Sequence, residues 1–123
     1  MRRILVIDDD VEFRQMLAKM LERAGYEVTE AANGREGMRL FREAPSELVI
    51  TDILMPEQDG VETVIELKRE FADTGIIAIS GGGQIDSKEY LRMAERLGVT
   101  HTLSKPFGRE ELLDAVKELL GEV

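Results

Sequence analysis

The stretch ILVIDDD at positions 4–10 gives the first prediction about the fold, because in it a short apolar run stops abruptly at three aspartates. Four consecutive apolar residues are typical of a strand covered on both faces, as in a parallel sheet. Apolar residues then recur at helical spacing from Phe13 to Leu21, and Gly25 closes that segment. The beginning of the chain therefore predicts a strand followed by an amphipathic helix.

The same alternation of apolar and amphipathic segments runs through the rest of the chain. Continuously apolar segments at 4–7, 48–50 and 76–79 predict strands in the middle of a sheet. Segments 26–31 and 100–103 interleave polar residues and are expected at the sheet edges. Strict strand–helix alternation predicts an α/β fold with helices on both faces of a parallel sheet. It fits a flavodoxin-like (βα)5 three-layer sandwich with strand order 2-1-3-4-5.

Two expectations concern the connections between strands. The helix over about 61–71 is expected to turn Val64 and Ile65 inward. The pairs Asn33-Gly34 and Asp59-Gly60 are interpreted as turns with no direct catalytic role.

Composition limits the function classes. The 123 residues carry 25 acidic and 16 basic side chains, a net charge of −9, which argues against direct nucleic-acid binding by this chain. The absence of cysteine removes disulfides and thiolate metal sites. The apolar run at 4–7 is too short for a signal peptide, and no segment approaches the roughly 18 apolar residues of a membrane span. We therefore expect a single cytoplasmic domain over residues 1–123 without membrane insertion.

Chemically useful side chains follow four of the five predicted strands. Asp8 and Asp9 follow the first strand, Asp52 the third, Ser80 the fourth and Lys105 the fifth. In this architecture the carboxyl ends of the strands border the ligand crevice. Two charges about 4 Å apart repel by roughly 4 kcal/mol at an effective dielectric near 20, so converging carboxylates need a cation. Oxygen ligands without a His or Cys cluster favour Mg²⁺.

These groups predict chemistry on a phosphoryl group. A metal ion, the ammonium of Lys105 and the hydroxyl of Ser80 together suit a phosphoryl group in transfer, where catalysis is mostly positioning and charge neutralisation. Asp52 would be the nucleophile and would form an acyl phosphate.

Four segments in order carry a family resemblance. They are ILVIDDD at 4–10, LVITDILMPEQDG at 48–60, ISG at 79–81 and KPF at 105–107. Together they resemble the receiver domain of two-component response regulators, of the stand-alone chemotaxis-regulator kind. The resemblance implies that Asp52 accepts a phosphoryl group from a phosphohistidine of a sensor kinase or phosphotransfer protein. It also implies that Asp9, Asp52 and the backbone carbonyl of Leu54 bind Mg²⁺ directly, with Asp8 assisting largely through water.

The resemblance extends to the last third of the chain. It implies that Ser80 and Lys105 contact the phosphoryl oxygens and that the Lys105-Pro106 bond is cis. Asp86 or Ser87, with Glu89 as a capping-box partner, predicts a fourth helix that runs to Leu97. The resemblance implies that the face made by this helix, the fifth strand and the fifth helix is the output or dimer surface. The sequence departs from the family pattern at two places. Thr102 occupies a position where many receivers have an aromatic residue, and the glycines after Ser80 predict a mobile loop over 81–86.

The sequence favours a phosphorylation switch that is not a turnover enzyme over three other functions. Phosphatases with an aspartyl nucleophile usually have a second carboxylate two residues later, where this chain has Leu54. A flavin module would need a phosphate loop after the first strand, where Asp8, Asp9 and Asp10 would repel the phosphate. A degenerate receiver that acts as a phosphorylation-independent docking module remains the alternative.

Overall fold

The computed structural model describes residues 2–53, 59–80, 92–93, 95–99 and 101–122, and its strands form one parallel sheet. The strands are β1 (Arg3–Ile7), β2 (Glu27–Ala31), β3 (Leu48–Asp52), β4 (Gly75–Ser80) and β5 (His101–Ser104). Their order is β2-β1-β3-β4-β5, with β2 and β5 at the edges. The flavodoxin-like order and both edge strands are therefore confirmed.

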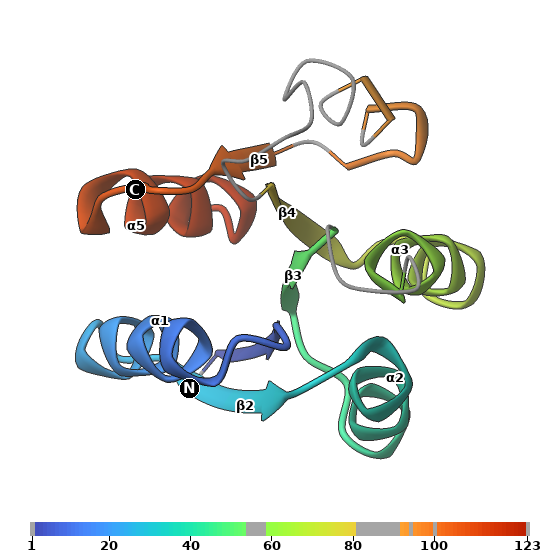
Figure 1. Ribbon diagram of the computed structural model, residues 1–123, viewed down its shortest axis with the longest axis horizontal. Helices are drawn as coiled ribbons and strands as arrows, with labels where there is room; N and C mark the ends of the chain where they lie inside the picture. Colours follow the sequence, from blue (N-terminus) through green and yellow to red (C-terminus); the bar gives the residue numbers. More distant parts are fainter. Residues whose placement is uncertain (1, 54–58, 81–91, 94, 100, 123) are drawn as a thin grey trace.

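Helices cover both faces of the sheet. Within the described residues they are α1 (Val11–Arg23), α2 (Gly34–Glu43), α3 (Asp59–Glu70) and α5 (Arg109–Leu119). Figure 1 shows α1 and α5 on one face and α2 and α3 on the other. The fourth predicted helix, over about 86–97, and the predicted mobile loop over 81–86 lie wholly or mostly outside the described residues.

The core consists of two layers separated by the sheet. Ile4 and Val6 of β1 pack in the cluster that includes buried residues of α1 and α5. Leu5 and Ile7 pack in the cluster that includes buried residues of α2 and α3. Side chains of a strand point alternately to its two faces, so both sets must be apolar when both faces are covered. This explains the uninterrupted apolar run that ends at Asp8.

Asn33-Gly34 and Asp59-Gly60 both start helices, which corrects their interpretation as turns. The side chain of Asn33 caps α2 and accepts a hydrogen bond of 2.9 Å from the backbone N–H of Glu36. Asp59 and Gly60 are the first residues of α3. Gly60 lies so close to β3 that a Cβ atom there would overlap the backbone carbonyl of Asp52. Its missing side chain lets α3 start against the end of that strand.

The inward face of α3 differs in one residue from the expectation. Val64 is fully buried, whereas Ile65 is 39% exposed, so the prediction for Ile65 was wrong. The buried positions are Gly60, Thr63, Val64 and Leu67, which follow the helical spacing of three and four. Ile65 lies one position, about 100°, beyond that stripe.

No helix in the part of the chain that the structure describes is long and apolar enough to cross a membrane.

Candidate functional site: aspartates and a lysine at the carboxyl end of the sheet

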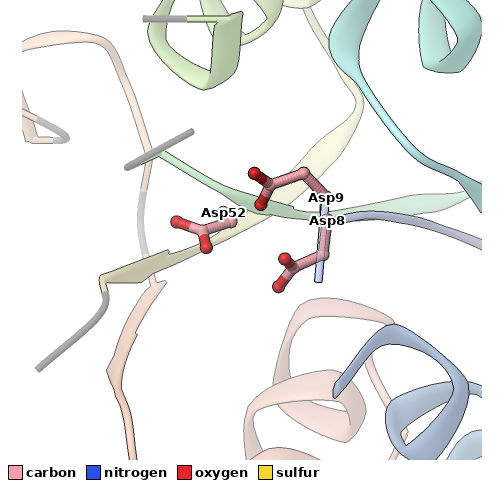
Figure 2. Close-up of side chains that lie close together, drawn as sticks. All are labelled: Asp8, Asp9 and Asp52. Atoms are coloured by element: carbon pink, nitrogen blue, oxygen red, sulfur yellow. The ribbon is translucent and has the colours of Figure 1, made fainter. Parts of the chain in front are cut away.

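Three carboxylates converge where β1 and β3 end. The two strands are neighbours, and Ile7 pairs with Thr51, so Asp8 and Asp52 leave the sheet side by side. Figure 2 shows Asp8, Asp9 and Asp52 together, and one carboxylate oxygen of each lies within 4.8 Å of the others. Asp8 is fully buried and Asp52 is 5% exposed, whereas Asp9 faces solvent. The predicted acidic cluster is therefore present, with one open side at Asp9.

Lys105 reaches this cluster from the far side of β4. Its ammonium lies 3.3 Å from Oδ2 of Asp8 and 3.3 Å from Oδ2 of Asp52. The backbone N–H of Lys105 donates to the carbonyl of Ser80 at 2.9 Å, which extends the β4–β5 ladder by one residue. The peptide bond to Pro106 is cis, as the family resemblance implied.

The ammonium of Lys105 is strongly held in its charged form. Burial alone would lower the pKa of Lys105. The negative charges of Asp52 and Asp8, with the hydrogen bonds to both, raise it by more, so the pKa lies above its usual value. Lys105 is therefore a fixed positive charge between two carboxylates.

The negative charge of Asp8 is only partly compensated, although the ammonium of Lys105 lies beside it. Burial raises the pKa of Asp8, and the charge of Asp52 raises it further. The backbone N–H of Asp10, which donates to Oδ1 of Asp8 at 2.9 Å, and the nearby Lys105 both lower it. Burial prevails and the pKa of Asp8 remains raised. One lysine does not offset the acidic cluster, and a further cation would be stabilised there.

The donor set fits Mg²⁺. All three side chains offer carboxylate oxygens, which are the ligands that this hard ion prefers, and the exposed side at Asp9 leaves room for water or phosphate oxygens. The backbone carbonyl of Leu54, which the family resemblance adds to this set, lies outside the described residues.

Ser80 ends β4, next to the acidic cluster. The register pairs Asp52 with Ile79, so Ser80 comes one residue beyond the partner of Asp52. Its side chain is nearly buried, and its Oγ lies 3.4 Å from Oγ of Ser104 on β5. The hydroxyl is therefore located at the same edge of the sheet as Asp52 and Lys105.

Comparison with known proteins identifies the family. The model of the response regulator receiver domain matches residues 4–117. The chain belongs to the response regulator receiver family. It is 35% identical to the response regulator receiver protein CpdR of Brucella abortus, over 98% of both chains. It is 32% identical to the chemotaxis protein CheY of Halobacterium salinarum, over 97% of both chains.

Other relatives and solved structures show the same receiver fold. The chemotaxis protein CheY4 of Vibrio cholerae superposes with a TM-score of 0.86 at 31% identity, and the match covers 97% of this chain and 98% of that one. A receiver domain protein from Clostridium thermocellum superposes with a TM-score of 0.89 at 30% identity, covering 98% and 95% of the two chains. The transcriptional regulatory protein CpxR homolog of Haemophilus influenzae is 32% identical, but only 51% of its length is covered. Receivers of this family are in general signalling modules of two-component systems.

Two residues that support the site of this receiver domain were not predicted for that role. Arg14 donates from Nη1 to the backbone carbonyl of Asp8 at 3.0 Å and from Nε to Glu30 on β2 at 3.0 Å. Phe13 lies with its ring 4.0 Å, measured to the centroid, from the ammonium of Lys105. The sequence indicated Phe13 only as part of an apolar helix face, because spacing shows which face a residue occupies but not which side chain meets it.

Proposed function

We propose that this chain is a phosphoacceptor receiver in which Asp52 takes a phosphoryl group from a phosphohistidine of a sensor kinase or histidine phosphotransfer protein. The observation that carries the proposal is the convergence of three carboxylates with an ammonium that touches both Asp8 and Asp52. Phosphorylation then changes the binding of an output partner. The whole of residues 1–123 acts as a single receiver domain, in the cytoplasm where such donors present their phosphohistidine.

The transfer is a substitution at phosphorus. An oxygen of Asp52 attacks the phosphorus atom, and the new P–O bond forms as the P–N bond to the donor imidazole breaks. The imidazole nitrogen keeps the electron pair of that bond and takes up a proton. The product is an acyl phosphate on Asp52 and a neutral histidine on the donor.

The surrounding residues stabilise the negative charge of the phosphoryl group during its transfer. The ammonium of Lys105, which contacts an oxygen of Asp52 in the structure, donates to a phosphoryl oxygen in its place. The hydroxyl of Ser80 donates to another phosphoryl oxygen. Asp9, Asp52 and the carbonyl of Leu54, with Asp8 assisting, would hold Mg²⁺. That ion would supply positive charge against the phosphoryl oxygens.

The output surface is proposed on the fourth helix, β5 and α5. The last two elements are joined across this face by the Nε2 atom of His101 and the Oε2 atom of Glu118, which lie 3.1 Å apart. Ser104, at the end of β5, pairs with Ser80, so a shift of the Ser80 hydroxyl toward a phosphoryl group acts directly on this strand. Position 102 on β5 is a threonine and has no aromatic ring that could rotate. The coupling between Ser80 and β5 therefore passes through backbone and hydroxyl contacts.

The direct test is phosphoryl uptake from acetyl phosphate with Mg²⁺, followed by mass spectrometry of the intact chain. The wild-type protein is expected to gain the mass of one phosphoryl group, and Asp52→Asn is expected to gain none. Asp73→Asn, at an exposed position after α3, is the matched control and should label like the wild type. Labelling of Asp52→Asn at the wild-type level would refute Asp52 as acceptor. A wild-type protein that is never labelled, by this donor or by a phosphohistidine protein, would favour the docking-module alternative.

A further inference from the structure

The ammonium of Lys105 has a third neighbour besides the two aspartates. The ring of Phe13 presents its face to Nζ at 4.0 Å, well within the range of a cation–π contact. The cation is partly desolvated, with 21% of its side chain exposed, and such contacts strengthen as water is removed.

The ring itself is held in place by groups of the same site. The backbone N–H of Phe13 donates to Oδ1 of Asp10 at 3.1 Å, and the backbone N–H of Asp10 donates to Oδ1 of Asp8. Lys105, which contacts the ring of Phe13, in turn donates a hydrogen bond to Oδ2 of Asp8. The ring of Phe107 packs edge-on against Phe13, with centroids 5.7 Å apart and an interplanar angle of 88°. Phe13 is therefore connected to the acidic cluster through both its backbone and its side chain.

We propose that Phe13 is a positioning residue that holds the ammonium of Lys105 at the acidic cluster, ready for the incoming phosphoryl group. This inference deepens the proposed function and rests on it for the identity of the reaction. A free lysine side chain populates many rotamers, and a fixed ring face reduces the conformations that compete with the reactive one.

An aromatic face suits this task better than a polar group. An ammonium has three N–H donors, and two of them point to Asp8 and Asp52. A carboxylate or amide at position 13 would take the third donor, whereas a ring attracts the cation without a directional hydrogen bond. A ring at this position therefore does not compete with the carboxylates or with a phosphoryl oxygen for the N–H donors of Lys105. A contact without strict direction also lets Lys105 shift toward that oxygen without losing the ring.

The test replaces Phe13 by mono-, di- and trifluorinated phenylalanine, introduced by stop-codon suppression. Fluorine changes the shape of the ring little but progressively removes the negative charge of its face. The rate of phosphoryl uptake from acetyl phosphate with Mg²⁺ is expected to fall stepwise, by about three- to tenfold in total. Phe13→Tyr, which keeps an electron-rich face, should retain the wild-type rate, and Phe13→Leu should lose at least as much as the trifluorinated ring.

The matched control is the same fluorinated series at Phe41. That ring is buried on the opposite face of the sheet and packs against Phe71 with centroids 4.7 Å apart. Fluorination there should leave the uptake rate unchanged. A fall of the same size in both series would show a general effect of core packing and would overturn the proposal.

A second measurement does not depend on phosphorylation. In the Mg²⁺-free protein, the NMR order parameter of the Lys105 methylene carbon next to Nζ should fall as Phe13 is fluorinated and stay constant in the Phe41 series. An unchanged order parameter, or an unchanged uptake rate in a protein that does accept the phosphoryl group, overturns the role of Phe13. If the wild-type protein takes up no phosphoryl group, the proposed function fails while the order parameter still decides this inference.

Discussion

Asp8 combines complete burial with a negative charge, and its surroundings compensate that charge only in part. The nearby Asp52 opposes ionisation, while the N–H of Asp10 and the ammonium of Lys105 favour it. Because the net effect raises the pKa of Asp8, the folded Mg²⁺-free protein carries an electrostatic cost at neutral pH.

Asp8→Asn is therefore expected to stabilise the Mg²⁺-free protein at pH 7 by on the order of 1 kcal/mol, because the cost of burying the charge and the repulsion by Asp52 together exceed the lost ion pair with Lys105. Asp8 binds its proton more tightly in the folded than in the unfolded chain, so wild-type stability rises relative to the variant as the pH falls through the raised pKa. The advantage of Asp8→Asn should thus shrink with falling pH. Urea denaturation at several pH values measures it. An advantage that grows as the pH falls would contradict the prediction.

Addition of Mg²⁺ should reverse the ranking of the two proteins. An ion that binds the folded state stabilises it in proportion to its affinity, and the wild-type site offers one carboxylate more than the variant. The thermal midpoint of the wild type is expected to rise with Mg²⁺ by more than that of Asp8→Asn. Equal shifts in both proteins would mean that Asp8 does not contribute to the metal site.

The placement of Asp8, Asp9, Asp52, Ser80 and Lys105 at one edge could be predicted because it follows from topology. Each follows or ends a strand, and the carboxyl ends of parallel neighbours meet whatever the side chains are. The contact of Phe13 with Lys105 could not be predicted in this way. It depends on how α1 lies against the β5–α5 connection, and spacing along a helix carries no information on that partner.

At the scale of elements, helix starts were the least predictable feature. Asn-Gly and Asp-Gly pairs serve turns and helix starts equally well, and the choice depends on whether a hydrophobic face follows at helical spacing. The edge strands were predictable, because only these two interleave polar residues, and the order 2-1-3-4-5 is the flavodoxin-like arrangement that fits those edges.

The start of α3 against β3 makes a testable prediction at this scale. Gly60→Ala should lower the free energy of unfolding by about 2–3 kcal/mol, because a methyl group would collide with the backbone carbonyl of Asp52, which cannot rotate away. The matched control is Gly108→Ala, at the N-cap of α5, where an added Cβ meets nothing within 4 Å. It should cost less than about 1 kcal/mol. Equal losses for both variants in urea denaturation would contradict the close approach at Gly60.

The cap of α2 makes a second prediction. Asn33→Ala should cost about 1 kcal/mol of stability, since the backbone N–H of Glu36 then loses its acceptor. Asn33→Asp keeps an acceptor and should retain most of that stability. If a turn rather than a cap were formed there, both variants would lose similar amounts.

At the scale of the whole molecule, residues near the two ends of the described chain are joined at the amino end of the sheet, away from the acidic cluster. Arg2 donates to the carbonyl of Leu120 at 2.7 Å and lies near Glu122. Tyr26, just before β2, donates its hydroxyl to Oε1 of Glu122 at 2.7 Å. These contacts connect the end of α5, on the proposed output face, to the opposite edge of the sheet.

This connection should make the free energy of unfolding depend on pH in the alkaline range. Burial, the hydrogen bond to Glu122 and the charge of Glu122 raise the pKa of Tyr26 to about 12. Between the ordinary tyrosine value near 10 and about 12, Tyr26 is ionised in the unfolded chain but protonated in the folded one. The unfolded state then binds fewer protons, so the contribution of Tyr26 to stability is complete below pH 10 and is lost as the pH rises toward 12. Tyr26→Phe lacks this loss.

The free energy of unfolding of the wild type should therefore fall more steeply than that of Tyr26→Phe between about pH 10 and 12. At pH 8 the wild type should be the more stable by about 1.5–3 kcal/mol, the usual effect of a hydrogen bond to a charged group. In Glu122→Gln, the acceptor remains but the charge is gone, so the extra slope should be smaller than in the wild type. Parallel pH curves for the wild type and Tyr26→Phe would show that the hydroxyl of Tyr26 does not hold the end of α5 to the sheet.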